Sequence, residues 1–201
     1  MKIKSLMISD PITITDKASV REAIEVMKTN SIRHLPVVSK GNILKGFVTM
    51  ADLRTGLIPS MVAGLSLSDI MIKDPITIDP DSDVEVAAQL IYKHKIGGIP
   101  VVKKGKLVGI ITETDLLRAF IDMMGILTAS SRIDVAIGSE RGLFKKALQV
   151  IEDNGGEVIN VSMAIHRARK RVYSFRLAPC KTGVIKDALE KEGYRVVAAM
   201  D

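Results

Sequence analysis

The sequence contains little of several residue types, and each scarcity excludes a class of protein. A single cysteine, Cys180, excludes an internal disulfide framework and fits a reducing cytoplasm. There is no tryptophan and aromatic residues make up 3% of the chain, so its cores must be aliphatic. Long apolar runs are also missing. The most apolar stretch, 57–72, is interrupted by Pro59, three serines and Asp69, so it falls short of the roughly 20 apolar residues of a membrane span.

The amino-terminal residues, MKIKSLMISD, carry two lysines and no long apolar segment after them, which is not typical of a secretory signal. We therefore expect a cytoplasmic protein that does not associate with membranes. The formal net charge of +6 favours anionic partners, whether nucleotide phosphates, nucleic acid or acidic protein surfaces. Charge alone does not choose among them.

An internal repeat dominates the first two thirds of the chain. The peptide DPITI occurs at residues 10–14 and again at 74–78. Further along, GFVTMADL at 46–53 matches GIITETDL at 109–116, with the second copy one residue shorter between the two matches. A deletion in a hairpin turn explains that slip.

Each copy predicts a short strand, a helix, two strands and a second helix. In the first copy the apolar residues within 20–27 recur at the spacing of one helix face, and Ser19 with Glu22 predicts a capping box. The runs HLPVV and LKGFVTM, joined by SKGN, predict a buried hairpin. The following MADLRTGL predicts a helix that ends before Pro59.

One such unit cannot bury all of its apolar faces alone, whereas two pseudo-symmetric copies can pack together. The peptide DPITI, the amphipathic helix, IRHLPVV and GFVTMADL resemble the CBS repeat. The resemblance implies an α/β fold in which repeats 1–64 and 65–128 form a CBS pair, or Bateman module. It also implies a regulatory ligand in the clefts between the repeats, an adenine nucleotide such as AMP, ADP or ATP, or S-adenosylmethionine.

The sequence Thr-x-x-Asp follows a strand and opens a helix in both copies, as Thr49 with Asp52 and as Thr112 with Asp115. A hydroxyl beside the free N–H groups of a helix start can hold a phosphate, and a carboxylate three residues later can accept both hydrogen bonds of a ribose diol. In the CBS family the matching positions contact phosphate and ribose. The same spacing is also an ordinary helix cap, and the two roles can coexist.

Arg33 and His34, just before the first predicted hairpin, add one fixed and one titratable positive group and point to an anionic ligand. In CBS proteins with basic residues at matching positions, these side chains reach phosphates. A solvated loop is the alternative interpretation. The second copy has Gly97 and Gly98 there, which removes the charge and permits close backbone approach, so we expect the two clefts to differ.

Adenine needs an apolar slot with backbone hydrogen-bonding groups. The CBS resemblance, rather than spacing, assigns the walls of that slot to the two DPITI segments and to the hairpins that follow them. The candidates are Ile12, Thr13, Ile14, Pro36, Ile76, Thr77, Ile78, Gly98 and Pro100. Core packing is the alternative for these residues, above all for Ile14 and Ile78.

From residue 129 the pattern changes to strand, helix, strand, strand, helix, strand, which predicts a ferredoxin-like βαββαβ domain over 129–201. Gly142 opens the first helix and Asn154-Gly155 closes it, and these features resemble the ACT domain. A proline is common before that glycine in the family, whereas this chain has Arg141. The resemblance implies side-by-side pairing of sheets, so we expect a homodimer.

The segment HRARKRV, 166–172, concentrates positive charge at a predicted hairpin tip. Contact with nucleic acid is one interpretation. A solvated turn whose charges protect a sheet edge is the other, and the lack of interleaved aromatic residues favours it.

No nucleophile with its base and no metal-ligand spacing is visible, so we expect no catalytic residues, metal or cofactor, and no enzyme activity. The leading hypothesis is a regulatory protein that senses an adenosyl ligand and signals through a dimer or an unknown protein partner. CBS repeats followed by an ACT-like domain resemble regulatory proteins of the acetoin-utilization type. A nucleic-acid-binding regulator and a structural module without nucleotide are the alternatives.

Overall fold

The computed structural model describes residues 1–55, 66–125, 127, 129–165 and 171–201, apart from the side chains of residues 54, 55 and 165. The chain divides into two compact units, Met1–Arg118 and Ala119–Asp201. Their boundary falls within helix α5 (Glu113–Met123). The basic segment 166–170 and the predicted end of the second helix of the first repeat lie outside the described residues.

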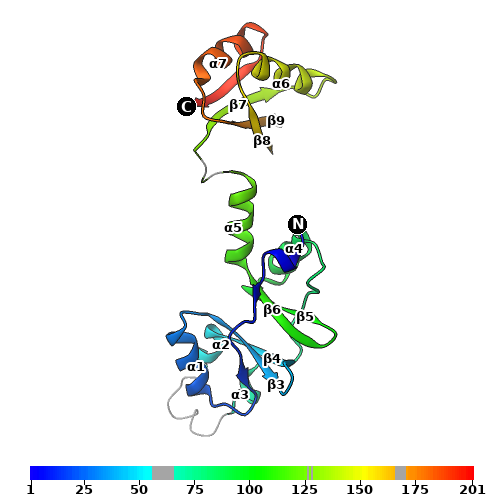
Figure 1. Ribbon diagram of the computed structural model, residues 1–201, viewed down its shortest axis with the longest axis vertical. Helices are drawn as coiled ribbons and strands as arrows, with labels where there is room; N and C mark the ends of the chain where they lie inside the picture. The colour runs from blue at the N-terminus through cyan, green and yellow to red at the C-terminus, as the bar shows by residue number, and fades with distance from the viewer. Residues whose placement is uncertain (56–65, 126, 128, 166–170) are drawn as a thin grey trace. The chain divides into compact units, whose positions relative to one another are not determined.

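The first unit contains both repeats, and each repeat has a helix followed by a strand pair (Figure 1). Its elements are η1 (Ile3–Ser5), β1 (Ile8–Ser9), β2 (Ile14–Thr15), α1 (Val20–Thr29), β3 (His34–Ser39), β4 (Ile43–Thr49), α2 (Met50–Thr55), α3 (Leu67–Ile70), α4 (Val84–His94), β5 (Gly98–Lys103), β6 (Lys106–Thr112) and the start of α5. The turn between β5 and β6 is one residue shorter than the turn between β3 and β4, as the slip in the repeat predicts.

Helix α1 forms as its sequence predicts. The carboxylate of Glu22 accepts a hydrogen bond from the Ser19 backbone N–H at 2.7 Å, and the Glu22 N–H donates to Ser19 Oγ at 3.2 Å. The predicted capping box is therefore confirmed. Val20, Ala23 and Met27 are buried in one aliphatic core with residues of β3 and β4, which confirms the predicted apolar face.

The strands of the two repeats form one sheet. Strands β3 and β4 pair antiparallel, as do β5 and β6, and β2 adds to β3 in parallel. The two hairpins meet where Ile43 lies opposite Lys106. The strand order is β1-β6-β4-β3-β2, with β5 beside β6.

The segment that precedes DPITI in each copy joins the sheet of the other copy. Strand β1 pairs with β6 of the second repeat, with Ile8 opposite Ile110. Conversely, Ile72 pairs with Phe47 of β4 in the first repeat, and Leu67 is fully buried in the core of that repeat. Figure 1 shows the amino-terminal end of the chain, marked N, beside α4. Residues 1–64 and 65–128 are therefore the repeats of the sequence. In the fold, the segment that begins each repeat packs on the strands of the other repeat.

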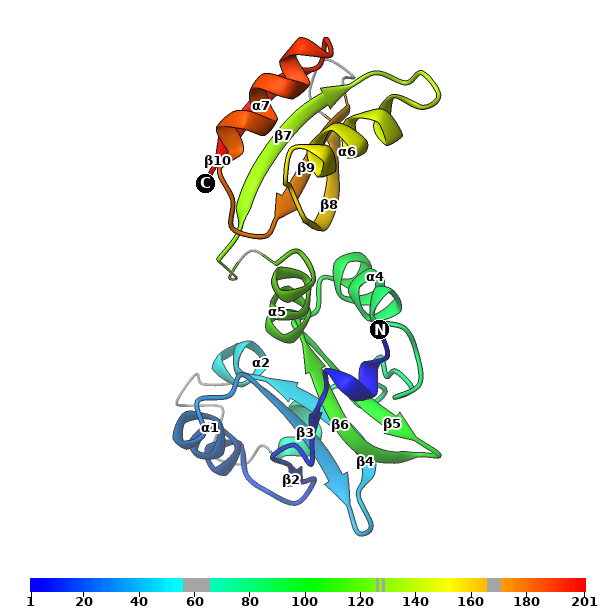
Figure 2. The same ribbon diagram turned by 45° about the horizontal axis from the view of Figure 1, so that its top comes forward.

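The second unit has the βαββαβ order that its sequence predicts. Its elements are β7 (Ser131–Ile137), α6 (Leu143–Asp153), β8 (Val158–Ile165), β9 (Arg171–Leu177), α7 (Thr182–Lys191) and β10 (Arg195–Met200). The antiparallel sheet has the order β10-β7-β9-β8. Helices α6 and α7 cover one face, and Ile151 and Ile185 pack there against Phe175 in a separate core (Figure 2).

Candidate functional site

A cavity of about 740 Å³ lies within the first unit, in the size range of small-molecule sites. Both repeats contribute to it. Its walls come from the ends of β3 and β4, the start of α2, the segment around the second DPITI, and the residues that precede β5 and begin α5. The lining residues are Arg33, His34, Phe47, Thr49, Met50, Ala51, Asp52, Ile72, Asp74, Pro75, Ile76, Lys95, Ile96, Gly97, Gly98 and Glu113.

Thr49 and Asp52 form a helix cap at this cavity. Asp52 Oδ2 accepts hydrogen bonds from the Thr49 N–H at 2.9 Å and from Thr49 Oγ1 at 2.7 Å. Thr112 and Asp115 repeat the arrangement, with distances of 2.9 and 2.6 Å. Both pairs are therefore caps, as the structural interpretation of Thr-x-x-Asp predicts.

The two caps differ in their surroundings. Thr49 and Asp52 line the cavity, whereas Thr112 and Asp115 are not among its described lining residues. The acceptor in both of these bonds is Asp52 Oδ2, so they leave Oδ1 outside the cap. Ligand contact by any of the four residues stays a prediction.

His34 lies where the two repeats meet. Its ring stacks on Phe47, with the ring centroids 5.9 Å apart. A Cβ atom on Gly97 would lie 2.7 Å from His34 Nε2, and one on Gly98 would lie 3.3 Å from Cδ2. The glycine pair of the second copy thus makes room for the histidine of the first, and all of these residues line one cavity instead of belonging to two different clefts.

Burial lowers the pKa of His34, and the neighbouring Arg33 guanidinium lowers it further. Glu113 and Asp52 oppose this effect by favouring the imidazolium form. Because the shift is downward from 6.5, the ring is neutral at pH 7. At neutral pH His34 therefore offers a hydrogen-bonding imidazole, and Arg33 supplies the fixed positive charge of the pair.

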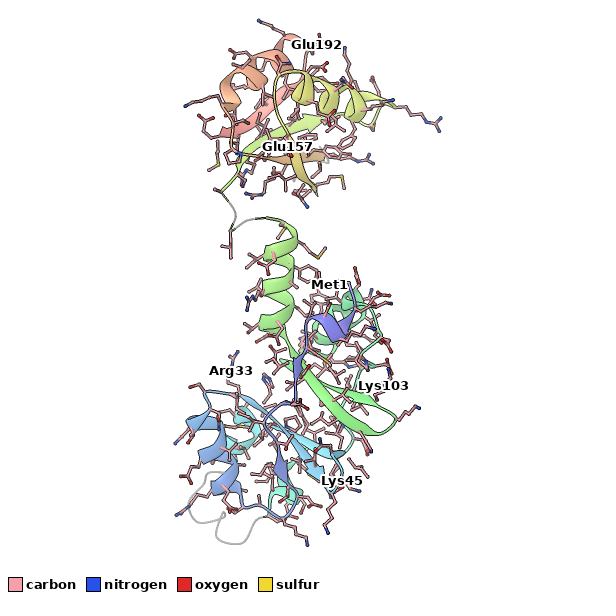
Figure 3. The ribbon with its side chains drawn as sticks, viewed as in Figure 1. Met1, Arg33, Lys45, Lys103, Glu157 and Glu192 are labelled. Carbon is pink, nitrogen blue, oxygen red and sulfur yellow. The ribbon has the colours of Figure 1, made fainter. Side chains whose placement is uncertain are left out.

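Arg33 and Glu113 bring opposite charges to the same part of the cavity. The Arg33 guanidinium lies 3.8 Å from Glu113 Oε1, and the two side chains are 68% and 55% exposed. Figure 3 shows the labelled Arg33 side chain extending outward from the first unit. An exposed pair at this distance is weak, so a ligand can separate it at little cost.

Only part of the predicted adenine slot lines the cavity, namely Ile76 and Gly98. Ile14 and Ile78 instead pair with β3 and β5, and Ile78 is buried while Ile14 is partly buried against the core of the first repeat. Pro36 and Pro100 are buried within the hairpins. The other predicted residues outside the described lining are Ile12, Thr13 and Thr77.

Sequence reasoning missed several walls of the cavity. The apolar ones are Phe47, Met50, Ala51, Ile72 and Ile96, and the charged ones are Lys95 and Glu113. Asp74 and Pro75 also line the cavity, and they belong to the second DPITI segment that the CBS resemblance assigns to the walls. Glu113 stands inside the second Thr-x-x-Asp, so that motif carried part of its signal.

A second cavity of about 480 Å³ lies in the carboxy-terminal unit, lined by Gly138, Ser139, Arg171 and Arg195 among others. No cluster of three metal-ligating side chains occurs among the described residues. Within those same ranges, no helix has the length and apolar character needed to cross a membrane.

Residues 3–58 and 67–122 match the CBS domain family. The chain belongs to the CBS-domain family. Among its relatives, the homoserine O-acetyltransferase of Methanocorpusculum labreanum is 40% identical over 119 residues, which cover 58% of this chain. The chain spans 23% of that enzyme's length.

Solved CBS structures have the same fold. The CBS pair of protein MJ0100, in complex with 5′-methylthioadenosine and S-adenosyl-L-methionine, is 30% identical with a TM-score of 0.56, over 60% of this chain and 95% of the other. A Vibrio cholerae protein described as an acetoin utilization protein (AcuB) is 31% identical with a TM-score of 0.57, over 63% and 94%. CBSX2 in complex with AMP is 26% identical with a TM-score of 0.54, over 60% and 96%.

Proposed function

We propose that this chain is a regulatory protein whose CBS pair binds an adenosyl ligand in the cavity beside Asp52. The observation that carries the proposal is a built cavity at the helix cap of the first repeat, in a protein whose structural relatives hold AMP, methylthioadenosine or S-adenosylmethionine. The ligand acts as a regulatory signal, and we propose no catalytic residue, metal or cofactor for the chain.

The ribose binds at Asp52 in this proposal. The cap holds the carboxylate in place through Oδ2, and Oδ1 remains to accept from the ribose diol. Thr49 stands at the start of α2, where helix N–H groups favour an anionic group. Because Thr112 and Asp115 do not line the cavity, we propose one ligand per chain, with the second cap serving stability.

The adenine packs between apolar walls of the same cavity. Met50 and Ile72 come from the first repeat and the segment docked on it, and Pro75 and Ile76 come from the second DPITI. Gly97 and Gly98, from the segment that leads into β5, also lie on this lining. The ligand therefore contacts both repeats, so its binding stabilises the contact between them, which supplies a means of signalling.

We propose that the carboxy-terminal unit is an ACT-like domain through which the protein forms a homodimer in the cytoplasm. Strand β8 lies at an edge of the sheet, and Ile159, Val161 and Met163 on it are exposed. An apolar edge strand is stabilised by pairing with a second copy. A monomer by light scattering at micromolar concentration would contradict this part of the proposal.

Thermal-shift measurements with AMP, ADP, ATP, S-adenosylmethionine and methylthioadenosine test the main proposal. A ligand present at 100 times its dissociation constant adds about 2.7 kcal/mol to the free energy of unfolding and raises the melting temperature. Guanosine and GTP serve as controls for the base. The absence of any shift with all adenosyl compounds would sink the proposal.

A further inference from the structure

The charged side chains of the cavity suit some adenosyl ligands better than others. Among the described lining residues, two are basic, Arg33 and Lys95, and three are acidic, Asp52, Asp74 and Glu113. The cavity therefore has no surplus of positive charge to hold a polyphosphate chain. A nucleoside triphosphate would bring several negative charges close to three carboxylates.

Glu113 is not explained by the helix cap. The cap of the second repeat needs only Thr112 and Asp115, and the first repeat has Met50 at the matching position. The backbone N–H of Glu113 bonds to the Gly97 carbonyl oxygen at 3.1 Å, which fixes the start of α5 against the segment leading into β5. Glu113 thus places a negative charge at the cavity that the repeat itself does not require.

Arg33 and Glu113 together form a receptor for a zwitterion. A guanidinium and a carboxylate 3.8 Å apart, both exposed, can open to accept a carboxylate at Arg33 and an ammonium group at Glu113. Asp52 and His34 line the same cavity as this charged pair. The proposed ribose partner and the pair can therefore contact different parts of one ligand, the nucleoside and its 5′ substituent.

We infer that the cavity selects an adenosyl amino acid, the class of S-adenosylmethionine and S-adenosylhomocysteine, over nucleoside polyphosphates. Arg33 holds the α-carboxylate of this ligand and Glu113 its α-ammonium group. Glu113 is the residue that determines selectivity, since it attracts the ammonium group and repels phosphates. The inference rests on the proposed function and names the ligand class of the same cavity.

Titration calorimetry on the full chain tests the inference with four ligands: S-adenosylmethionine, S-adenosylhomocysteine, methylthioadenosine and ATP. We expect S-adenosylhomocysteine to bind more tightly than ATP. In Glu113→Gln, binding of S-adenosylhomocysteine weakens about 10-fold, because a charge-assisted hydrogen bond is lost. Methylthioadenosine, which lacks the amino acid group, keeps its affinity, and ATP binds more tightly than to the unchanged protein.

Two variants complete the design. Arg33→Gln should also weaken the binding of S-adenosylhomocysteine about 10-fold and leave the affinity for methylthioadenosine unchanged. Glu85→Gln, at an exposed position of α4 away from the cavity lining, is the control for Glu113→Gln, because it makes the same change in net charge, and it should alter neither affinity. Melting temperatures confirm that each variant folds.

The outcomes separate the two proposals. If methylthioadenosine binds but ATP binds as tightly as S-adenosylhomocysteine, or Glu113→Gln changes all ligands alike, the amino acid selectivity is wrong while the adenosyl cavity stands. If none of the four ligands binds, the amino acid selectivity is wrong, and if AMP and ADP also fail to shift the melting temperature, the proposed function is overturned as well.

Discussion

Gly46 leaves free the space that the side chain of Met71 occupies. A Cβ atom on Gly46 would lie 2.5 Å from the sulfur atom of Met71 and 3.0 Å from the backbone oxygen of Ile72. The second repeat repeats the arrangement, with a Cβ atom on Gly109 at 2.6 Å from the sulfur atom of Met7. These two glycines allow each leading segment to dock on the sheet of the other repeat.

Gly46→Ala should therefore lower the free energy of unfolding by about 1–3 kcal/mol, the usual range for overpacking a buried contact. Urea denaturation measures the change. Gly183→Ala is the matched control, because a Cβ atom there meets nothing within 4 Å and the residue lies in helix α7. Alanine at that position should stabilise by about 0.5–1 kcal/mol. Equal effects of the two substitutions would contradict the docking argument.

Asp81 ties the amino-terminal segment to the second repeat. Its carboxylate accepts from Lys103 and from Lys4, both at 2.8 Å, and these bonds lower its pKa to about 2. Because the folded-state pKa lies below the ordinary value of 3.8, the link is fully present above that value and is lost as the pH falls toward 2. Asp81→Asn should speed amide exchange at Ile3 near neutral pH, whereas Asp187→Asn, at an exposed position of α7, should not. If the amide exchange rate at Ile3 is unchanged in Asp81→Asn, the backbone hydrogen bonds alone hold the amino-terminal segment on the second repeat.

The local parts of the fold could be predicted because they depend on neighbouring residues. The Ser19 cap, the helix it begins and the alternation in the carboxy-terminal strands all follow from short-range patterns. The exchange of leading segments could not be predicted in this way. Nothing near Ile72 indicates whether it pairs with its own repeat or with Phe47 of the other.

The same difference between local patterns and long-range packing explains which cavity residues could be predicted. Thr49 and Asp52 were found through a motif, whereas Lys95 and Ile96 line the cavity only because the repeats pack as they do. The predicted adenine residues Ile14 and Ile78 are apolar and periodic, and that is also what a strand core requires. Apolar patterns alone cannot separate a binding wall from a core.

His34 makes stability depend on pH. Its folded-state pKa is lowered by burial and by Arg33, despite the opposing Glu113 and Asp52, so the unfolded chain binds the proton more readily. The contribution of His34 to the free energy of unfolding is therefore fully present above the pKa of the unfolded chain, about 6.5, and is lost as the pH falls below that pKa. The melting temperature of the unchanged protein should drop between pH 7.5 and 5.5 more than that of His34→Gln. His94→Gln, which changes an exposed histidine, should keep the full drop.

Asp52 and Asp115 form the same cap, yet only Asp52 lines the cavity. Asp→Ala at either position should lower the free energy of unfolding by about 1 kcal/mol through loss of the cap. Calorimetry with S-adenosylhomocysteine and methylthioadenosine should then separate the two. Asp52→Ala should weaken the binding of both ligands by about 1.5–3 kcal/mol, because a charged acceptor of two ribose hydrogen bonds is lost. Asp115→Ala should leave the affinity for both ligands unchanged.

The asparagine variants separate capping from ligand contact still further. The amide oxygen of Asn can still accept from the Thr49 N–H, so Asp52→Asn should keep most of the stability while losing the charge that strengthens the bonds to the ribose diol. A loss of affinity with little loss of stability in this variant is therefore the expected signature of ligand contact. If Asp115→Asn weakens binding as much as Asp52→Asn, the ligand uses the second repeat as well, and one ligand per chain is wrong. If neither variant changes any adenosyl affinity, both aspartates are caps alone and the ribose lies elsewhere.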